Sequence, residues 1–498
     1  MPAPFRIYNT LSREVETFEP QTEGKVGLYV CGMTVYDHCH VGHARAMVVF
    51  DVFVRYLRHR GWDVTFVRNF TDVDDKIISR AAEQGRDPAE LAQSFIDAFQ
   101  EDVANLGLAH PTHEPRVTTS IDQIIAMIQR LVDAGHAYAA DGSVWFDVVT
   151  DDDYGKLSSR KVDDQLSNPD KGDGKRSPAD FALWKGAKPG EPQWESPWGP
   201  GRPGWHIECS AMAEKCLGET IDIHGGGLDL VFPHHENEIA QSESSHAGAC
   251  YARYWMHNGL LTLPGGPKMG KSLGNVINLR DALKDFPAEA IRLYYLQNQY
   301  RSPLPWDETA LPDALAMLSR LYEAREKAEA MSGEEPAETV AKQLGADALK
   351  VLELGRGFQK RFYAAVDHDF NTAQGLGFLF ELVRALNRFS NHKKARKRGG
   401  PVVASALEAF RLVHEALGLM GMGTSAFHDE VKAKRLGTLG VKRSDVEAKI
   451  EARSQARADK DWGRADAIRD ELVAMGIEVL DLPDGVTWRV KLATAEEA

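Results

Sequence analysis

The sequence has no long hydrophobic run and few cysteines. No stretch approaches the roughly 18 to 20 apolar residues that a membrane span needs, and the first residues lack the apolar core of a secretory signal. We therefore expect a cytoplasmic protein that does not contact a membrane. The five cysteines are an odd number without a C-x-x-C pair, which argues against a disulfide framework and for reduced thiols, some of them catalytic or bound to metal.

The chain also lacks an excess of positive charge. Its formal net charge of −14 speaks against a simple nucleic-acid coat protein, although local basic surfaces such as residues 392–398 remain compatible with an acidic body. The composition, with 43% hydrophobic and 27% charged residues, is that of a globular protein. Because 498 residues are too many for one core, we expect about three domains.

Residues 26–45 are the stretch around which we interpret the rest of the chain. An apolar run typical of a buried strand leads into a loop with Cys31, Cys39, His40 and His43, and a helix is expected from about residue 44 to 58. Such a loop presents backbone N–H groups and the positive end of a helix dipole, which suits a phosphate. The β-branched residues at 63–68 predict the next parallel strand of a βαβ unit.

The wider pattern predicts an α/β protein with a Rossmann-type domain at residues 1–310. A loop-rich connective insertion is expected at about 110–205, a helix bundle at 311–425 and a small mixed α/β unit at 430–498. Amphipathic helices are predicted at 76–106 and 116–135, and one helix at 444–476 precedes a short β segment. A strand pair should turn at Asp141 and Gly142.

Four residues from three distant parts of the sequence are candidates for a metal site. Cys31 and Cys209 supply thiols, while His234 and Glu238 are spaced i, i+4, so that a helix would place them on one face. Zinc accepts thiolate, imidazole and carboxylate ligands together. From spacing alone the alternative stays open that the cysteines are core thiols and residues 234–238 an ordinary helix start.

Two short motifs suggest nucleotide chemistry. His40-x-Gly42-His43 alone could be a capped turn, and the loop with Lys268 and Lys271 alone could be solvated. Together, one at a helix start and the other on a glycine-rich loop, they predict imidazoles that hydrogen-bond the phosphates of a nucleotide and lysines that neutralise a leaving pyrophosphate.

Four segments in sequence order carry a resemblance to a known family: CGMTVYDHCHVGHAR, GWHIECSAM, FPHHENEIAQS and KMGKSLGN. They look like the successive signatures of cysteinyl-tRNA synthetases, which are class I aminoacyl-tRNA synthetases, and the similarity continues to WRV near the C-terminus. Gly270 departs from the serine usual in the family's K-M-x-K-S loop; we expect altered loop dynamics without loss of activity. The segment at about 165–180 has no role that we can assign.

The resemblance implies a Rossmann-type class I catalytic domain, with a stem-contact region and the K-M-x-K-S loop at about 255–310, followed by the bundle and an anticodon-binding domain. It implies that the chain activates L-cysteine with ATP and Mg²⁺ and transfers it to tRNA(Cys). One Zn²⁺ would be bound by Cys31, Cys209, His234 and Glu238, and the substrate thiolate would add to it, which rejects serine. We expect a monomer.

The resemblance also implies roles for individual residues. His40 and His43 would stabilise charge on the α-phosphate, and Lys268 and Lys271 would hold the departing phosphates. Gly42, Gly226, Gly227, Asp229 and Lys271 are expected at the nucleotide, and Thr71, Trp205 and His224 at the cysteine.

In the C-terminal unit Trp462 could stack on an anticodon base beside Arg457, Asp466 and Asp481, unless it is a helix-packing residue.

Two other functions remain open from the sequence. One is a cysteine ligase that joins cysteine to an amino sugar with the same adenylating core, against which residues 430–498 argue. The other is a zinc-dependent RNA-binding protein with an inactive nucleotide site, against which both motifs argue.

Overall fold

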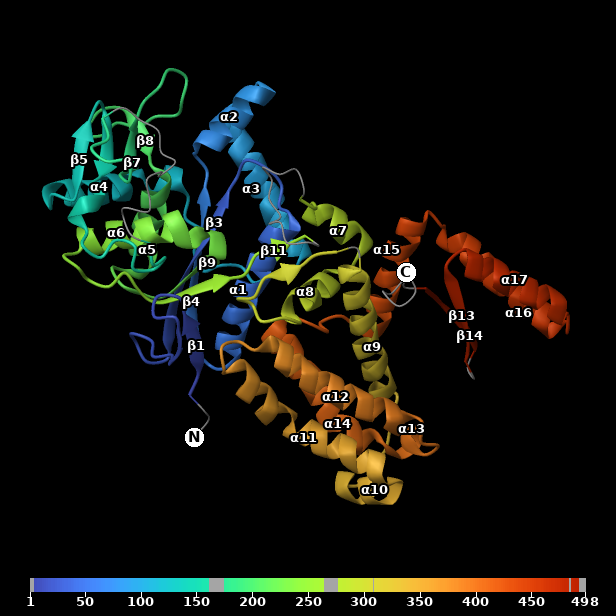
Figure 1. The fold of residues 1–498 in the computed structure, drawn as a ribbon. Helices are drawn as coiled ribbons and strands as arrows, with labels where there is room; N and C mark the ends of the chain where they lie inside the picture. The colour runs from blue at the N-terminus through green and yellow to red at the C-terminus, as the bar shows by residue number, and fades with distance from the viewer. Residues whose placement is uncertain (1–3, 161–173, 264–275, 308, 483–484, 492–498) are drawn as a thin grey trace.

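The computed structural model describes residues 4–160, 174–263, 276–307, 309–482 and 485–491. At its centre is a parallel sheet with the strand order β10-β9-β3-β4 (Figure 1). Its strands are Lys25–Thr34 (β3), Asp63–Thr71 (β4), Ile221–Gly227 (β9) and Ala252–Asn258 (β10). In the sheet, β4 lies on one side of β3 and β9 lies on the other. Open α/β sheets bind ligands at the carboxyl ends of strands that flank such a switch point.

Helices cover both faces of this sheet. Helix α1 (Val41–His59) connects β3 to β4 and packs on the face formed by Val26, Leu28 and Val64. Tyr29 and Val67 point to the opposite face, into a second hydrophobic cluster with α4 (Ile121–Asp133) and α5 (Trp205–Leu217). The alternation along β3 and β4 therefore buries both faces, as expected for a parallel sheet.

The insertion between β4 and β9 builds a second, antiparallel sheet in the order β5-β6-β7-β8. Its strands are Ala137–Ala140, Ser143–Phe146, Phe181–Gly186 and Gly201–Pro203. The predicted turn at Asp141 and Gly142 is confirmed, and both residues have positive φ, 51° and 76°. At the N-terminus, β1 (Arg6–Asn9) and β2 (Glu14–Thr17) form a separate antiparallel pair.

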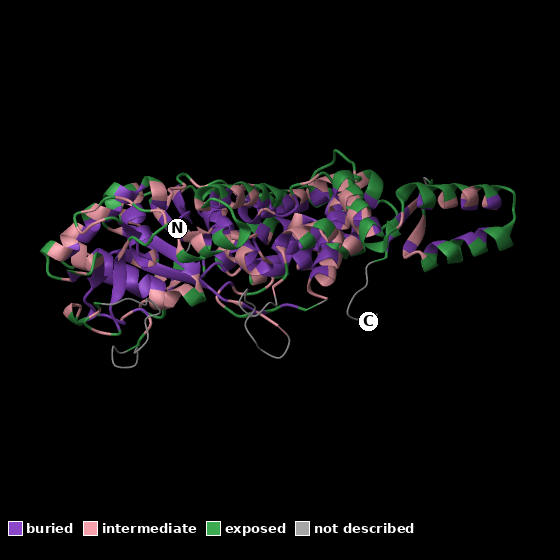
Figure 2. Ribbon diagram, turned by 90° about the horizontal axis from the view of Figure 1, so that it is seen from above, coloured by how far each residue is buried: buried purple, intermediate pink, exposed green. Residues whose placement is uncertain are grey.

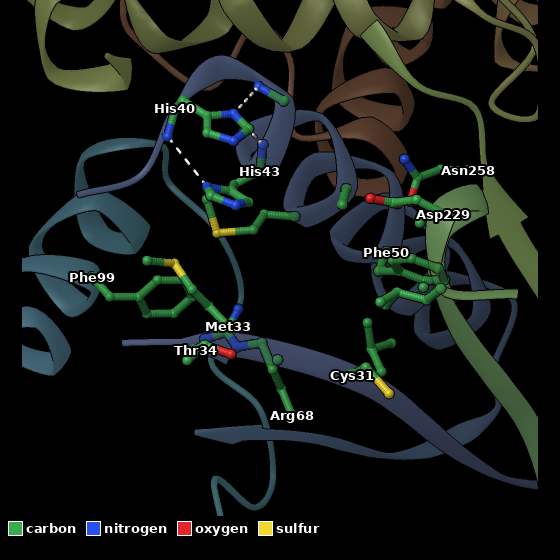
Figure 3. Close-up of a pocket in the computed structure, with 18 of the residues that line it drawn as sticks. Cys31, Met33, Thr34, His40, His43, Phe50, Arg68, Phe99, Asp229 and Asn258 are labelled. Carbon is green, nitrogen blue, oxygen red and sulfur yellow. Dashed lines mark hydrogen bonds between the residues drawn. The ribbon is translucent and has the colours of Figure 1, made fainter. Parts of the chain in front are cut away.

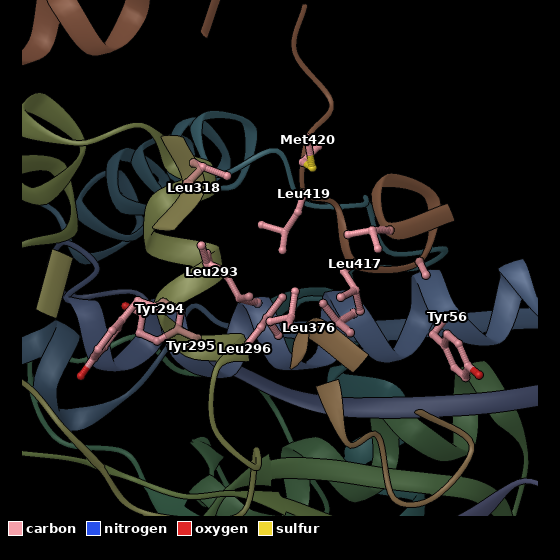
Figure 4. Close-up of a cluster of buried hydrophobic side chains, with 14 of the residues drawn as sticks. Tyr56, Leu293, Tyr294, Tyr295, Leu296, Leu318, Leu376, Leu417, Leu419 and Met420 are labelled. Carbon is pink, nitrogen blue, oxygen red and sulfur yellow. The ribbon is translucent and has the colours of Figure 1, made fainter. Parts of the chain in front are cut away.

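Beyond residue 278 the described chain is mainly helical. Up to residue 439 the helices are α7 (Leu279–Asp285), α8 (Ala288–Leu296), α9 (Ala310–Glu329), α10 (Ala337–Leu344), α11 (Ala346–Val366), α12 (Thr372–Ser390), α13 (Ala395–Arg398), α14 (Gly400–Leu417) and α15 (Thr424–Leu439). The short strand β12 (Leu304–Pro305) pairs in parallel with β11 (Leu261–Thr262), which precedes this region. The cluster around α1 continues through α8 into this bundle (Figure 4). No helix in the described part of the chain is long and apolar enough to cross a membrane.

The C-terminal unit projects from the rest of the molecule (Figures 1 and 2). It consists of α16 (Arg443–Ala458), α17 (Trp462–Ala474), β13 (Ile477–Leu482) and β14 (Gly485–Val490). A small cluster of its own, with Val446, Leu472 and Trp488, lies between the helices and the hairpin. Figure 2 shows mostly exposed residues on the outer sides of α16 and α17.

Helix boundaries differ from the predictions at two places. The single helix predicted at 76–106 is wrong, because the chain turns at Gly85 (φ 62°) and divides into α2 (Asp75–Gln84) and α3 (Pro88–Asn105). Asp87 caps α3, so the second start had a signal in the sequence. The single helix predicted at 444–476 is also wrong, since Lys460 has φ 62° and Asp461 caps α17.

The α/β part of the chain and the helix bundle share a buried ion pair. Arg292 of α8 is 1% exposed, and its Nη2 donates to Asp51 Oδ2 of α1 at 2.6 Å and to the carbonyl of Leu417 at 2.7 Å. Asp51 also accepts from Arg55 at 2.8 Å. The Arg292 side chain thereby joins α1, α8 and the end of α14.

We predict that Arg292→Met lowers the free energy of unfolding by about 3 kcal/mol, because Asp51 would stay buried with one cation fewer. The measurement is the midpoint of thermal unfolding. Arg388→Met, at an exposed arginine on α12 whose nearest carboxylate is 3.7 Å away, is the matched control and should leave the midpoint unchanged. Equal midpoints for wild type and Arg292→Met would contradict the prediction.

Candidate active site

A cavity of about 560 Å³ opens at the carboxyl ends of β3 and β9 (Figure 3). Figure 3 shows Cys31 on the strand, His40 and His43 across the cavity, and Asp229 and Asn258 at its side. Eight of the residues predicted from the sequence line it: Cys31, His40, Gly42, His43, Trp205, Gly226, Gly227 and Asp229. The fold thus brings thiol, imidazoles and the glycine-rich strand end to one place.

The four candidate metal ligands converge beside this cavity. Cys31 Sγ lies 3.7 Å from Cys209 Sγ, 3.4 Å from His234 Nε2 and 3.3 Å from Glu238 Oε1. His234 Nε2 and Glu238 Oε1 are 3.0 Å apart. A tetrahedral zinc site with bonds of about 2.0 to 2.3 Å separates its ligand atoms by roughly 3.3 to 3.8 Å. The three separations from Cys31 lie within this range and the one between His234 and Glu238 is slightly shorter, so the donor set fits one zinc ion.

Local structure explains why these side chains point inward. The register of β3 against β4 shifts between Val30 and Met33, and such a bulge redirects the side chain at Cys31. Gly32 permits this, because a Cβ there would lie 1.7 Å from the carbonyl oxygen of Asn69. Cys209 lies in α5, and an irregular segment, Val231–His235, in which Phe232 is extended (φ −138°, ψ 133°), places His234 just before α6 (Glu236–Ser245).

Electrostatics in the cluster favour bound positive charge. Burial raises the pKa of the Cys31 thiol, whereas the hydrogen bond from Cys31 lowers the pKa of Cys209 to about 6. Burial opposes charge on His234, but Glu238 and Cys209 outweigh it and raise its pKa to about 10. The pKa of Glu238 stays well below its usual range despite burial, because His224 and His234 stabilise the carboxylate. The buried site therefore keeps Cys31 a neutral thiol, holds Glu238 as a carboxylate and makes Cys209 the more readily ionised of the two thiols.

A second layer of side chains orients the ligands. His206 Nδ1 lies 3.0 Å from His234 Nδ1, and His224 Nε2 lies 2.8 Å from Glu238 Oε2. The hydroxyl of Tyr251 donates to the same carboxylate oxygen at 3.0 Å. Outer partners of this kind fix ligand rings and carboxylates in metal sites. A second set of nearby ligand atoms comprises Cys31, His224, His235 and Glu238, but it has one thiol fewer.

His40 and His43 form a capping box at the start of α1. His40 Nδ1 accepts from the backbone N–H of Gly42 at 3.0 Å and of His43 at 3.4 Å, and His43 Nδ1 lies 3.3 Å from the His40 amide. The rings stack with centroids 3.7 Å apart. An Nδ1 that accepts a hydrogen bond carries no proton, so each neutral ring has its N–H at Nε2. Both rings are thereby prepared as donors to an anion.

Glycines let the walls of the cavity approach closely. A Cβ at Gly225 would lie 2.3 Å from the ring of Phe50, and one at Gly227 would lie 2.5 Å from Asp229 Oδ1. A Cβ at Gly42 would lie 2.8 Å from the ring of His40. Of the glycines predicted at the nucleotide, Gly42 and Gly226 are therefore favoured by packing, since a Cβ at Gly226 would lie 2.7 Å from the ring of His235, whereas the contact at Gly227 is with a movable carboxylate.

The three residues predicted at the cysteine pocket differ in their surroundings. Trp205 lines the cavity and stacks on His234 with ring centroids 4.4 Å apart. Thr71 is 3% exposed, and its hydroxyl donates to Glu208 at 2.9 Å. His224 is fully buried behind Glu238, so it supports the metal ligands from outside the cavity.

Other predicted residues lie apart from the cavity. Lys268, Gly270 and Lys271 fall outside the described residues, as does much of the 165–180 segment. In the C-terminal unit Trp462 is 59% exposed at the start of α17, so it is not a core residue. Arg457 pairs with Asp481 at 2.6 Å, and Arg453 binds the same carboxylate at 2.9 and 3.0 Å. Asp466 lies 3.4 Å from Arg469.

Sequence reasoning missed several groups at the site. His206 and Glu208 stand inside the GWHIECS segment, but nothing in their spacing distinguishes an outer partner from a core residue. Arg68 and Asn258 line the cavity from β4 and β10. Their position at or near the carboxyl ends of parallel strands was the available signal.

Known protein families and individual proteins are similar in sequence to this chain. The family described as the class I (C) tRNA synthetase catalytic domain matches residues 17–316, the DALR domain matches 361–421, and the cysteinyl-tRNA ligase anticodon binding domain matches 443–489. Cysteine–tRNA ligase of Geobacter metallireducens is 49% identical over 98% of this chain and 99% of its own length. The ligase of Chromohalobacter salexigens is 47% identical over the same shares.

Solved structures share the fold at low identity. Methionyl-tRNA synthetase of Mycobacterium tuberculosis with methionyl-adenylate has a TM-score of 0.60 at 15% identity, covering 79% of this chain and 92% of that one. The leucyl-tRNA synthetase of Agrobacterium radiobacter K84 has a TM-score of 0.59 at 11% identity, covering 82% and 87%. The parallel sheet with its cavity, the three matched regions and the full-length identity lead to one conclusion: the chain belongs to the cysteinyl-tRNA synthetases, within the class I aminoacyl-tRNA synthetases.

Proposed function

We propose that this protein activates L-cysteine with ATP, releasing pyrophosphate, and transfers the cysteine to the 3′ end of tRNA(Cys). The observation that carries this proposal is one cavity lined by Cys31 and Trp205 on one side and by His40 and His43 on the other. A thiol-selective site next to donors for a phosphate is what joining cysteine to a nucleotide requires. Full-length similarity to cysteine–tRNA ligases supports the same reaction.

Cys31, Cys209, His234 and Glu238 would hold a Zn²⁺ ion. When bound, zinc supplies a soft Lewis acid that favours a thiolate over the hydroxyl of serine. Trp205, stacked on His234, would close the apolar side of the pocket. The hydroxyl of Thr71, which donates its hydrogen bond to Glu208, would face the substrate. The Thr71 oxygen then has a lone pair for the substrate's ammonium group.

Adenylate formation needs no general base, because the cysteine carboxylate is ionised at neutral pH. One of its oxygens attacks the α-phosphorus of ATP, the new O–P bond forms, and the bond to the β-phosphate oxygen breaks to release pyrophosphate. The Nε2–H groups of His40 and His43 would stabilise charge on the α-phosphate. Lys268 and Lys271 are proposed to hold the departing phosphates, and Mg²⁺ is expected to accompany ATP.

The nucleoside would lie against the end of β9. Gly226 and Gly227 leave room for it, and Asp229 offers a carboxylate to the ribose hydroxyls. In the second step a ribose hydroxyl at the 3′ end of tRNA attacks the adenylate carbonyl and AMP leaves. Three expectations stay predictions: the domain limits at 1–310, 311–425 and 430–498, the cytoplasmic location and the monomeric state.

The C-terminal unit supports tRNA over an amino sugar as the acceptor. Trp462 is exposed where a base could stack, and residues 443–489 match the anticodon binding domain. Asp481 is held by Arg453 and Arg457, so we propose that Arg457 reads a base only when it exchanges this ion pair for an RNA contact. Asp466 would act beside it.

The direct test is cysteine-dependent exchange between ATP and pyrophosphate, followed by charging of tRNA(Cys). We expect both activities. Exchange without charging of tRNA would favour the amino-sugar ligase, and absence of exchange would leave only an RNA-binding function.

For the metal we predict that Cys209→Ser loses zinc and cysteine-dependent exchange together, since a hydroxyl is a poor zinc ligand. Metal content is measured by atomic emission and exchange by the same assay. Cys250→Ser changes an exposed thiol outside the cluster and should keep both properties. Retention of zinc and of serine rejection by Cys209→Ser would refute the assigned ligand.

For the anticodon unit we predict that Trp462→Ala lowers kcat/KM for tRNA charging by about tenfold to a hundredfold, the worth of one base stack. Pyrophosphate exchange should not change. Trp462→Phe should keep most of the charging activity, and Val473→Ala, at another exposed apolar residue of α17, should keep all of it. Charging by Trp462→Ala at the wild-type rate would exclude the stacking role.

A further inference from the structure

A buried arginine follows the two histidines on α1. Arg45 is 1% exposed, and its guanidinium donates to three backbone carbonyls: Nη1 to Leu260 at 3.0 Å, and Nη2 to Tyr300 at 3.1 Å and to Ser302 at 2.5 Å. Among the described residues no carboxylate pairs with it. Desolvation lowers the pKa of Arg45 to about 10, so the side chain stays charged at neutral pH. A buried cation without a counter-ion is costly and calls for an explanation.

The carbonyls that Arg45 binds belong to two chain segments that cross beneath the cavity. The amide of Gly259 donates to the Tyr300 carbonyl at 2.8 Å, and that of Leu304 donates to the Leu260 carbonyl at 3.1 Å. β11 and β12 continue this pairing in parallel. The guanidinium group of Arg45 lies where the two segments meet and donates hydrogen bonds to both, so it fixes their position relative to α1.

Both sides of this contact line the cavity. Residues 258–261 form part of its wall, and so do His40, Gly42 and His43 from the first turn of α1. Arg45 stands two residues after His43, on the same rigid helix. A displacement of the 258–261 segment from α1 would therefore change the width of the cavity where the nucleotide is proposed to lie.

We propose that Arg45 is a positioning residue for adenylate formation, because its guanidinium holds the 258–261 wall against the helical turn that carries His40 and His43. This inference rests on the proposed function. Arg45 touches neither metal ligands nor the cysteine side of the cavity in the described contacts. Its loss should therefore affect ATP and leave zinc and cysteine binding intact.

The test compares Arg45→Met and Arg45→Lys with wild type in pyrophosphate exchange, normalised to active sites counted by the adenylate burst. We expect Arg45→Met to lower kcat/KM for ATP about a hundredfold, the effect of a misplacement near 1 Å, with zinc content and cysteine KM unchanged. Arg45→Lys keeps the charge but lacks the planar fork, so it should recover part of the loss.

Gly259→Ala tests the same wall without touching Arg45. A Cβ at Gly259 would lie 2.3 Å from the Ser302 carbonyl oxygen and would force the two segments apart. It should produce the same loss toward ATP, and it decides the question if Arg45→Met does not fold. Arg388→Met is the control, since it changes an exposed arginine on α12 and should leave KM for ATP unchanged.

Wild-type kinetics toward ATP in Arg45→Met and in Gly259→Ala would overturn the inference while the proposed function stands. Equal loss of zinc, cysteine binding and ATP binding in both variants would also overturn it, because that result marks a general structural role. Absence of exchange in the wild type itself would instead refute the proposed function.

Discussion

A carboxylate buried beside two thiols requires nearby positive charge, and the side chains at the carboxyl ends of the central strands are arranged around that requirement. Glu238 is fully buried, and it is stabilised by His224, His234 and Tyr251. Burial of an isolated carboxylate would cost several kcal/mol, so these contacts are a condition for the fold at this place. The proposed selectivity for a thiol and the stability of the strand ends thus depend on the same group of side chains.

The nucleotide side depends on a different principle, which is the ordering of backbone and imidazole donors at one helix terminus. His40 uses Nδ1 to cap α1, and this leaves the proton on Nε2, where an anion can accept it. The glycine at 42 allows the His40 ring to fold over the turn. Capping therefore does two things: it satisfies amides that the helix cannot pair, and it fixes the tautomer that phosphate binding needs.

Local patterns in the sequence predicted the α/β core and contained the two motifs. The convergence of the four candidate metal ligands followed from the family resemblance. The breaks at Gly85 and Lys460 were missed because both interrupt otherwise continuous helical periodicity, although Gly85, the capping Asp87 and Pro88 were a local signal for the first break. His206 and Arg45 were missed for another reason. His206 contacts His234, which is 28 residues away, and Arg45 contacts carbonyls that begin at Leu260, 215 residues away. No local pattern in the sequence reveals such contacts.

Helix α1 connects the chemistry to the part of the molecule proposed to bind tRNA. Its first turn carries His40 and His43, its middle pairs Asp51 with Arg292, and Tyr56 near its end donates to Asp367 of the bundle at 2.6 Å. From the bundle, Glu323 of α9 pairs with Arg489 of β14 at 3.2 Å. The first of these links are buried and the last is exposed. Since buried pairs resist displacement more than exposed ones, the bundle should move as one body with the active site, and the C-terminal unit should have the greater freedom to adjust to RNA.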